Sequence, residues 1–252
     1  MRFCSIGSGS KGNCTVIQQG KTTILIDNGF TLKEFEFRLA QKGLTPLDIT
    51  AVLITHEHGD HIKGVGPLSR KYKIPVYCSH GTAKFDGLGK IPTLKVIDSH
   101  DDFYIHDLKI TPVVVPHDAR EPTQFVAEYD GKKLGILTDL GSITPHICDV
   151  YSGCHGLLLE TNHDVEMLRM GPYPAKLKAR VEGHLGHLSN EQAGQFLHHI
   201  DHSQLRYLVA THISEQNNQL DLAVDRISSS FSWSADFIIV AKQETGFDWC
   251  EL

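Results

Sequence analysis

Residues 51–61 read AVLITHEHGDH, an apolar run that leads into three histidines and an aspartate. The run 51–55 is rich in β-branched residues and predicts a buried strand, so the polar cluster falls on the loop that follows it. A packed core has no use for so many imidazoles, because each buried one needs hydrogen-bond partners. The chain has 16 His, and at that frequency the pattern H-x-H-x-D-H is expected by chance about 0.005 times. The cluster therefore predicts a metal site.

Spacing within the cluster divides the ligands between two centres. His56 and His58 alternate by two, so they point the same way in an extended segment. Asp60 and His61 follow the turn at Gly59 and face a different point. Imidazole and carboxylate ligands suit Zn²⁺, Mn²⁺ or Fe²⁺. A single structural zinc is the alternative, but such sites are usually closed and rich in cysteine, and no Cys lies near this stretch of sequence.

Four other apolar runs end in a lone acid or histidine. They end at Asp27, His117, Asp139 and His212. An Asp after a strand is often a turn former, and an isolated His is often a surface group, so each alone is weak evidence. Together with residues 56–61, they predict further ligands at neighbouring strand ends.

Strand-like runs dominate the first half of the chain, and helices become frequent in the second. The predicted strands are bounded by Gly, Pro, Asn and Asp and cover 2–6, 14–19, 22–27, 51–55, 74–78, 103–107, 109–116, 125–130, 133–139 and 235–242. Helical spacing and capping residues predict helices over 31–43, 61–72, 189–200 and 218–231. No linker or repeat interrupts this order, so we expect a single α/β domain over 1–252, with sheets in the middle and helices outside.

Composition excludes several classes of protein. The net charge of −6 gives no general basic surface for nucleic acid. Residues 1–14 lack the apolar core of a signal peptide, and no apolar run reaches the roughly 18 residues that span a membrane. The six cysteines form no C-x-x-C pair and are typical of reduced thiols, so we expect a cytoplasmic protein with no membrane partner.

The order of these acids and histidines resembles the metallo-β-lactamase family, and the resemblance covers nearly the whole chain. It implies a four-layer αββα sandwich with the site at one edge, and two divalent metal ions (Zn, Mn or Fe) as cofactors. The implied ligands are His56, His58 and His117 for the first ion, Asp60, His61 and His212 for the second, and Asp139 as the bridge between them. Asp27 is implied to orient ligands from outside the coordination shell.

Two further segments indicate a branch of this family. Position 58 is His and not Glu, unlike the diiron redox enzymes. ATHIS (210–214) and GHLSNEQA (186–193) resemble segments of RNase Z-type phosphodiesterases. In those enzymes the His before the helix donates a proton, which implies His187 as the proton donor here. His184 is a second histidine in the same segment, and the sequence does not choose between the two.

The nearest resemblance is to the YycJ/WalJ-like exonuclease family. It rests on GSGSKGN (7–13), on 157–181, on GHLSN (186–190) and on THISEQNN (211–218); the insert domain of the β-CASP nucleases is lacking. The resemblance implies a metal-dependent phosphodiesterase, a 5′–3′ exonuclease whose partner is nucleic acid, DNA in particular. Two metals would activate a bridging water, Asp60 would orient it, and His187 would protonate the leaving alcohol.

Substrate contacts are predicted from three segments. Residues 163–186 form a candidate substrate-facing lid, whose basic side chains would follow a phosphate backbone while Tyr173 stacks on a base; an ordinary solvated helix is the alternative. Residues 7–13 offer hydrogen bonds near the site, or form a plain hairpin loop. Glu160, Asn162 and His163 either support ligands or cap a strand. The candidate substrate contacts are Ser10, Asn13, Asn162, Tyr173, Lys176, Lys178 and Arg180.

Two other functions remain open from the sequence. A metallohydrolase of a small ester, lactone, thioester or cyclic phosphodiester would use the same metals without the basic lid or His187. A non-enzymatic binding module stabilised by metal would need no open coordination position. The sequence also leaves open the metal, the choice of DNA over RNA, the polarity of the exonuclease or an endonuclease activity, and the oligomeric state.

Overall fold

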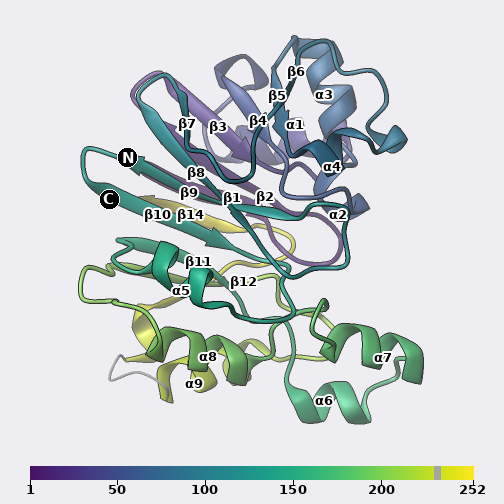
Figure 1. The fold of residues 1–252 in the computed structure, drawn as a ribbon, viewed down its shortest axis with the longest axis vertical. Helices are drawn as coiled ribbons and strands as arrows, with labels where there is room; N and C mark the ends of the chain where they lie inside the picture. The colour runs from purple at the N-terminus through teal and green to yellow at the C-terminus, as the bar shows by residue number, and fades with distance from the viewer. Residues whose placement is uncertain (230–233) are drawn as a thin grey trace.

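Two seven-stranded sheets packed face to face form the centre of the computed structural model, which describes residues 1–229 and 234–252 (Figure 1). The first sheet has the order β14-β1-β2-β3-β4-β5-β6 and the second β13-β12-β11-β10-β9-β8-β7. The strands of the first sheet are β1 (Arg2–Gly7), β2 (Cys14–Gln19), β3 (Thr22–Ile26), β4 (Ala51–Leu53), β5 (Val76–Cys78), β6 (Leu94–Val96) and β14 (Phe247–Glu251). Those of the second are β7 (Phe103–Ile105), β8 (Leu108–Val114), β9 (Thr123–Tyr129), β10 (Lys132–Leu137), β11 (Gly156–Glu160), β12 (Tyr207–Thr211) and β13 (Ile238–Val240).

Helices cover the outer faces of both sheets. The α-helices are α1 (Leu32–Gln41), α2 (Gly59–Ile62), α3 (Val65–Tyr72), α4 (His80–Ala83), α5 (Pro145–Tyr151), α6 (Val165–Met170), α7 (Ala175–Glu182), α8 (Asn190–His198) and α9 (Leu220–Ser229). Short 3₁₀ turns are η1 (Pro46–Asp48), η2 (Asp86–Leu88) and η3 (Ala235–Phe237). No helix among the described residues is long and apolar enough to cross a membrane.

Alternation along the strands builds three hydrophobic layers. Val52 of β4 packs outward with Phe35 and other residues under the helices, whereas its neighbour Leu53 packs inward between the sheets. On β11 of the second sheet, Leu157 faces the helix layer and Leu158 faces the first sheet. Strands buried on both faces read as continuous apolar runs, and Figure 1 shows, from top to bottom, the resulting order of helix, sheet, sheet and helix. The predicted αββα sandwich is confirmed.

Most helix boundaries follow the capping residues. The hydroxyl of Thr31 accepts the backbone N–H of Glu34 at the start of α1, and Ser189 and Gln192 form the predicted capping box of α8. The predicted helix over 61–72 is instead two helices, α2 and α3. Gly64 lies where they separate, and a Cβ there would come within 2.0 Å of the Phe30 carbonyl oxygen. The last two residues of the predicted helix 218–231 lie outside the described part of the chain.

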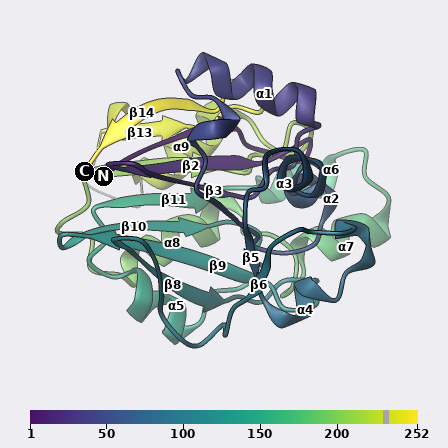
Figure 2. The same ribbon diagram turned by 90° about the horizontal axis from the view of Figure 1, so that it is seen from above.

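Parallel strand pairs bring distant segments to one edge of the sandwich. β3 is parallel to β4, and β10, β11 and β12 are parallel to one another. The carboxyl ends of parallel strands meet at the same edge, where ligands of α/β proteins usually bind. In Figure 2, this edge carries α2 and α7, and the two chain termini lie at the opposite end.

Candidate metal centre and active site

The candidate ligands occupy the loops directly after strands of both sheets. Asp27 follows β3, Asp139 follows β10 and His212 follows β12. Their φ angles are 64°, 52° and 52°, so three non-glycine residues adopt the left-handed conformation. Such backbone costs free energy and is concentrated at functional sites. The strained backbone at these three positions therefore supports a functional role for their side chains.

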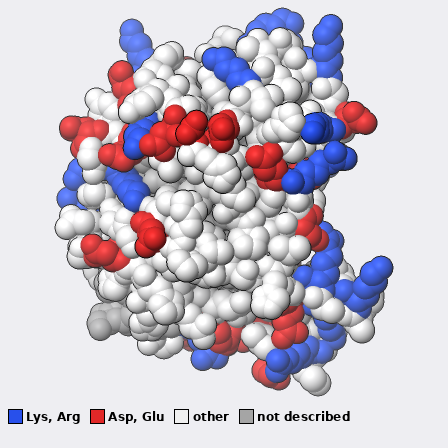
Figure 3. Space-filling model, in the orientation of Figure 1, with Lys and Arg blue, Asp and Glu red and all other residues white. Residues whose placement is uncertain are grey.

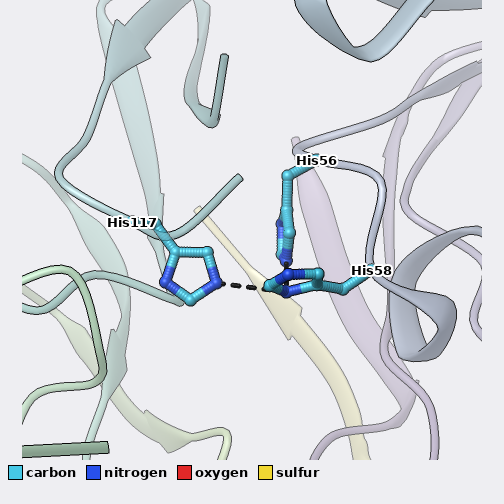
Figure 4. Close-up of side chains that lie close together, drawn as sticks. All are labelled: His56, His58 and His117. Atoms are coloured by element: carbon cyan, nitrogen blue, oxygen red, sulfur yellow. Dashed lines mark hydrogen bonds between the residues drawn. The ribbon is translucent and has the colours of Figure 1, made fainter. Parts of the chain in front are cut away.

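His56, His58 and His117 converge from two loops that face each other. His56 Nε2 lies 2.9 Å from His58 Nδ1, and His117 Nε2 lies 3.3 Å from the same atom (Figure 4). His56 and His117 are buried, and this burial lowers the pKa of both rings. Neutral imidazoles present lone pairs, so the three ring nitrogens can share one cation.

Asp60, His61, Asp139 and His212 form a second cluster beside the first. Nε2 of His61 lies 3.5 Å from Oδ2 of Asp60 and 3.3 Å from Oδ2 of Asp139. Nε2 of His212 lies 3.5 Å from Oδ2 of Asp60 and 3.5 Å from Oδ1 of Asp139. A tetrahedral shell with ligands at about 2.1 Å has edges of about 3.4 Å. These separations therefore match ligands placed around one cation.

Two observations favour a cation at this second cluster. Oδ2 of Asp139 and Nε2 of His212 are buried and have no hydrogen-bond partner. Burial lowers the pKa of His212, but the carboxylates of Asp139, Asp60 and Glu160 outweigh it and raise that pKa to about 10. The excess of negative charge therefore favours a positive charge here, and a divalent ion would supply it.

Three of the histidines are oriented through the ring nitrogen that faces away from their cluster. The contacts are His61 Nδ1 to Asp27 Oδ2 at 2.8 Å, His117 Nδ1 to the Gly186 carbonyl at 3.0 Å, and His212 Nδ1 to Glu160 Oε1 at 3.0 Å. Asp27 also accepts hydrogen bonds from the backbone N–H and hydroxyl of Thr55. Metal-binding histidines are usually held this way, with the second nitrogen donating to a carboxylate or carbonyl. The residues present thus fit two divalent ions.

Glu160 is a candidate functional residue that the sequence left undecided between ligand support and capping. It is fully buried at the end of β11, and Oε1 accepts from Nδ1 of His187 at 2.8 Å. Its other oxygen accepts the backbone N–H groups of Leu140 and Leu188, both at 3.1 Å. Burial lowers the pKa of His187, but Glu160 outweighs it and the net pKa is raised. The His187 ring is therefore held in one orientation and its protonated form is favoured.

A cavity of about 360 Å³ opens over both clusters; we call it the active-site cavity. Its lining includes the metal-cluster residues His58, Asp60, Asp139 and His212, with His187 on one wall. The candidate lid covers that side through Tyr173, Leu177, Arg180 and Val181. The remaining polar lining comes from Ser10, Asp118, Asn162, Ser214 and Asn217.

The candidate substrate contacts divide into two groups. Ser10, Asn162, Tyr173 and Arg180 line the active-site cavity. Asn13, Lys176 and Lys178 are not among its lining residues. The Asn13 amide lies beside the candidate ligand atoms, 3.2 Å from Nε2 of His61 and 3.4 Å from Oδ2 of Asp60. Lys178 instead donates to the Arg169 carbonyl within the lid.

His184 and His187 lie in different places. His187 lines the active-site cavity, whereas His184 is exposed and lines a separate groove beside α5 and α8. The peptide carbonyl of His184 accepts the Ser142 hydroxyl, which fixes the backbone there. Of the two, only His187 is positioned to reach a substrate above the metal clusters.

Arg180 joins the lid to the loop of the first cluster. Its Nε lies 2.5 Å from Oδ2 of Asp118, and Oδ1 of Asp118 lies 3.5 Å from Nε2 of His117. Burial raises the pKa of Asp118, but the hydrogen bond from Arg180 and the nearby charges of Arg180, His117 and His58 together outweigh it, and the net pKa is lowered. A guanidinium group thus lies at the mouth of a cavity whose floor would hold two cations.

Known proteins share both the sequence and this architecture. The model of the beta-lactamase superfamily domain matches residues 22–213. Exodeoxyribonuclease YycJ of Bacillus anthracis is 36% identical over 227 residues, which cover 88% of this chain and 86% of the relative. Exodeoxyribonuclease WalJ of Streptococcus pneumoniae is 34% identical over 230 residues, with coverage of 88% and 85%. The solved metallo-β-lactamase fold protein YhfI from Bacillus subtilis superposes with a TM-score of 0.76 at 18% identity, covering 100% of this chain and 98% of that one.

Proposed function

This chain belongs to the metallo-β-lactamase superfamily and, within it, to the branch of the YycJ and WalJ exodeoxyribonucleases, and we propose that it removes nucleotides from the 5′ end of DNA. The observation that carries this proposal is the His187–Glu160 pair beside two clusters suited to metals. A metal-stabilised binding module has no need of such a pair. A hydrolase that expels a poor leaving group needs a positioned proton donor.

Two divalent ions, Zn, Mn or Fe, are the proposed cofactors. The proposed ligands are His56, His58 and His117 for one ion, Asp60, His61 and His212 for the other, and Asp139 between them. When bound, such a pair supplies a water of lowered pKa and positive charge for the phosphate. Asp60 is the proposed base that orients this water, because its carboxylate also lines the active-site cavity.

His187 is the proposed proton donor to the leaving oxygen. Its Nδ1 is held by Glu160, which leaves Nε2 to face the substrate. General-acid catalysis of this kind is worth about 10²- to 10⁴-fold. Because His187 lines the active-site cavity beneath the lid, the leaving oxygen belongs to the nucleotide that occupies this cavity.

The size of the active-site cavity and the position of Arg180 support digestion in the 5′-to-3′ direction. Its volume is near the lower end of the about 300–1,000 Å³ of small-ligand pockets, so it suits one terminal nucleotide rather than a passing strand. A 5′-terminal nucleotide leaves through its 3′-oxygen and carries its own phosphate. A 3′-terminal nucleoside would leave through its 5′-oxygen without one. Arg180 at the mouth of the cavity favours the 5′-terminal nucleotide, because its guanidinium can pair with the phosphate that this nucleotide carries.

We propose residues 163–186 as a substrate-facing lid of a single domain over 1–252. In this lid, Tyr173 stacks on the terminal base and Arg180 binds its phosphate, while Ser10 and Asn162 contact the sugar and phosphate from the opposite wall. Lys176 and Lys178 lie further out and would act on DNA only at longer range. The six cysteines are all free, which supports a cytoplasmic location, since reduced thiols are the rule there.

The direct test is digestion of DNA labelled at one end, with Mn²⁺ or Zn²⁺ supplied. Strands labelled at the 5′ end should release labelled mononucleotide at the first turnover, whereas 3′-labelled strands should shorten gradually. RNA of the same sequence and double-stranded DNA are run in parallel. Faster turnover of thioesters, lactones or nitrocefin than of any nucleic acid would establish the small-substrate alternative instead.

A further inference from the structure

A second concave surface adjoins the active-site cavity on the side away from the lid. We call it the outer groove; its volume is about 780 Å³ and it is lined by Ser10, Lys11, Gly29, Glu57, Gly59, Asp60, Ile62, Lys63, Phe85 and Gly87. Ser10, Gly59 and Asp60 line both spaces. The two spaces are therefore adjacent, with Asp60 on the rim between them.

Figure 1 locates the helices around the two spaces. The lid helix α7 lies below α2 at the right-hand edge, and α4 lies above it. Figure 3, in the same orientation, shows that edge hollowed, with Lys and Arg side chains standing both above and below the hollow. Lys63 lines the outer groove and is exposed, and Lys84, the residue before Phe85 in the sequence, is exposed as well.

The outer groove has a fixed aromatic ring in its wall. Phe85 is half-buried and packs partly against the core under α3. A Cβ at Gly87 would lie 2.2 Å from Cε1 of Phe85, so the glycine backbone closes directly on the ring. A ring held in this way is a preorganised platform on which a base can stack at low entropic cost.

Lys63 is the cation of the outer groove that is free to meet a phosphate. It is exposed, and no ion pair involves it within residues 1–229 and 234–252. Lys11 is paired with Glu215 at 2.6 Å. The acids that face the groove are already engaged. Glu57 accepts the backbone N–H of Arg120 at 2.8 Å, and Asp60 belongs to the second metal cluster.

We propose that the outer groove binds the single strand immediately 3′ of the cleaved phosphate, with Phe85 stacking on a base and Lys63 pairing with a phosphate. This inference rests on the proposed function, in which the 5′-terminal nucleotide fills the active-site cavity. The strand then crosses the rim at Asp60 and leaves through the outer groove. Stacking is tolerant of base identity, so the subsite adds affinity for strand length without selecting a sequence.

The test is the dependence of kcat/KM on strand length. 5′-Phosphorylated DNA from a dinucleotide to a decanucleotide is digested by the metal-loaded wild type, Lys63→Ala and Phe85→Leu. Phe85→Leu keeps an apolar side chain against the core and removes the aromatic face. Lys21→Ala and Tyr104→Leu are the matched controls, because both residues are exposed and lie at the end of the sheets away from the site.

The wild type should gain kcat/KM with length, and each groove variant should lose about 10-fold on the decanucleotide while cleaving the dinucleotide normally. The control variants should follow the wild type at every length. Equal kcat/KM values for wild type and both groove variants on the decanucleotide would overturn the outer groove alone. If the wild type cleaves the dinucleotide but gains nothing with length, the outer groove is again excluded. A wild type that cleaves no DNA of any length would overturn the proposed function, and this inference with it.

Discussion

The carboxylate of Glu160 lies 2.8 Å from Nδ1 of His187, and the same oxygen lies 3.0 Å from Nδ1 of His212. One buried acid therefore orients both the proposed proton donor and a proposed metal ligand. The other oxygen of this acid is held by two backbone N–H groups. Four donors around one carboxylate leave it no freedom to turn, so the spacing between proton donor and metal cluster is set by β11.

Glu160→Gln should lower kcat on DNA by about 10²-fold or more. The amide keeps the shape but brings an N–H₂ group into a site where every partner is a donor, which leaves unpaired donors in the interior. Steady-state kinetics with metal analysis is the measurement, since displaced His212 should also weaken metal binding. Glu191→Gln on α8, where the acid pairs with Arg226 at the surface, is the control. Wild-type kcat in Glu160→Gln would rule out the positioning role.

Metal analysis should find two ions per chain. Two groups of ligand atoms, His56–His58–His117 and Asp60–His61–His212, each lie close enough to hold an ion. Elemental analysis after purification without chelator should therefore exceed one equivalent of Zn, Mn or Fe. Chelation should lower Tm by on the order of 10 °C, because ions that bind only the folded chain stabilise it by mass action. A content of one equivalent or less after reconstitution would exclude the dinuclear site.

Asp60→Ala should abolish phosphodiesterase turnover and leave the fold intact. Its Oδ2 lies 3.5 Å from both His61 and His212, at the rim where the two spaces join. Losing a metal ligand or a base usually costs about 10²-fold or more. Turnover and circular dichroism are measured together. Turnover above about a tenth of the wild type would remove Asp60 from the mechanism.

His187→Ala should separate DNA from an activated ester. A nucleotide 3′-alkoxide is a poor leaving group and needs a proton, whereas p-nitrophenolate does not. The variant should therefore lose about 10²-fold or more on DNA and far less on bis-p-nitrophenyl phosphate. His184→Ala, in the neighbouring exposed position, is the matched control and should keep both activities. Equal losses on the two substrates would instead indicate that His187 supports a metal ligand.

The structure brings together the candidate residues whose sequence signal is local. The candidate ligands of 56–61 lie in one loop, and strand ends marked Asp27, His117, Asp139 and His212. Glu160 also ends an apolar run, but its partners His187 and His212 lie 27 and 52 positions away. Parallel pairing of β11 with β12 brings His212 to it, and no local pattern shows this contact, so the sequence left its role undecided. The lid was equally hard to orient, because α7 has no buried residue and its apolar residues Leu177 and Val181 line the active-site cavity instead of a core.

The break between α2 and α3 at Gly64 also results from contacts between residues that are distant in the sequence. The local pattern of 61–72 is helical, but the chain must pass close to the Phe30 carbonyl and changes direction there. Tertiary contacts of this kind override local propensity. This turn lets α2 place Asp60 and His61 in the second cluster, while α3 packs over the sheet.

Arg180→Ala should remove selectivity for a 5′-phosphate. The guanidinium lies at the mouth of the active-site cavity and is held by Asp118 until a substrate phosphate competes for it. A charge-assisted hydrogen bond of this kind contributes enough for about a 10-fold effect or more on kcat/KM. The measurement is the ratio of kcat/KM for strands with a 5′-phosphate to that for strands with a 5′-hydroxyl. The ratio should fall toward one in Arg180→Ala and stay partly elevated in Arg180→Lys, which keeps the charge without the fork.

Two companion variants decide whether this effect belongs to Arg180 or to the basic lid as a whole. Lys176→Ala combined with Lys178→Ala removes two nearby charges that do not line the cavity. That double variant should keep the wild-type ratio of kcat/KM for 5′-phosphate over 5′-hydroxyl strands. It should lose only the salt-sensitive part of its affinity for DNA. Asp118→Asn frees the guanidinium of Arg180, so it should lower KM for 5′-phosphorylated strands. The metal content of this variant is measured as a control. If the double lysine variant loses the 5′-phosphate preference and Arg180→Ala keeps it, the phosphate is bound further out on the lid, and the active-site cavity does not receive the 5′ end.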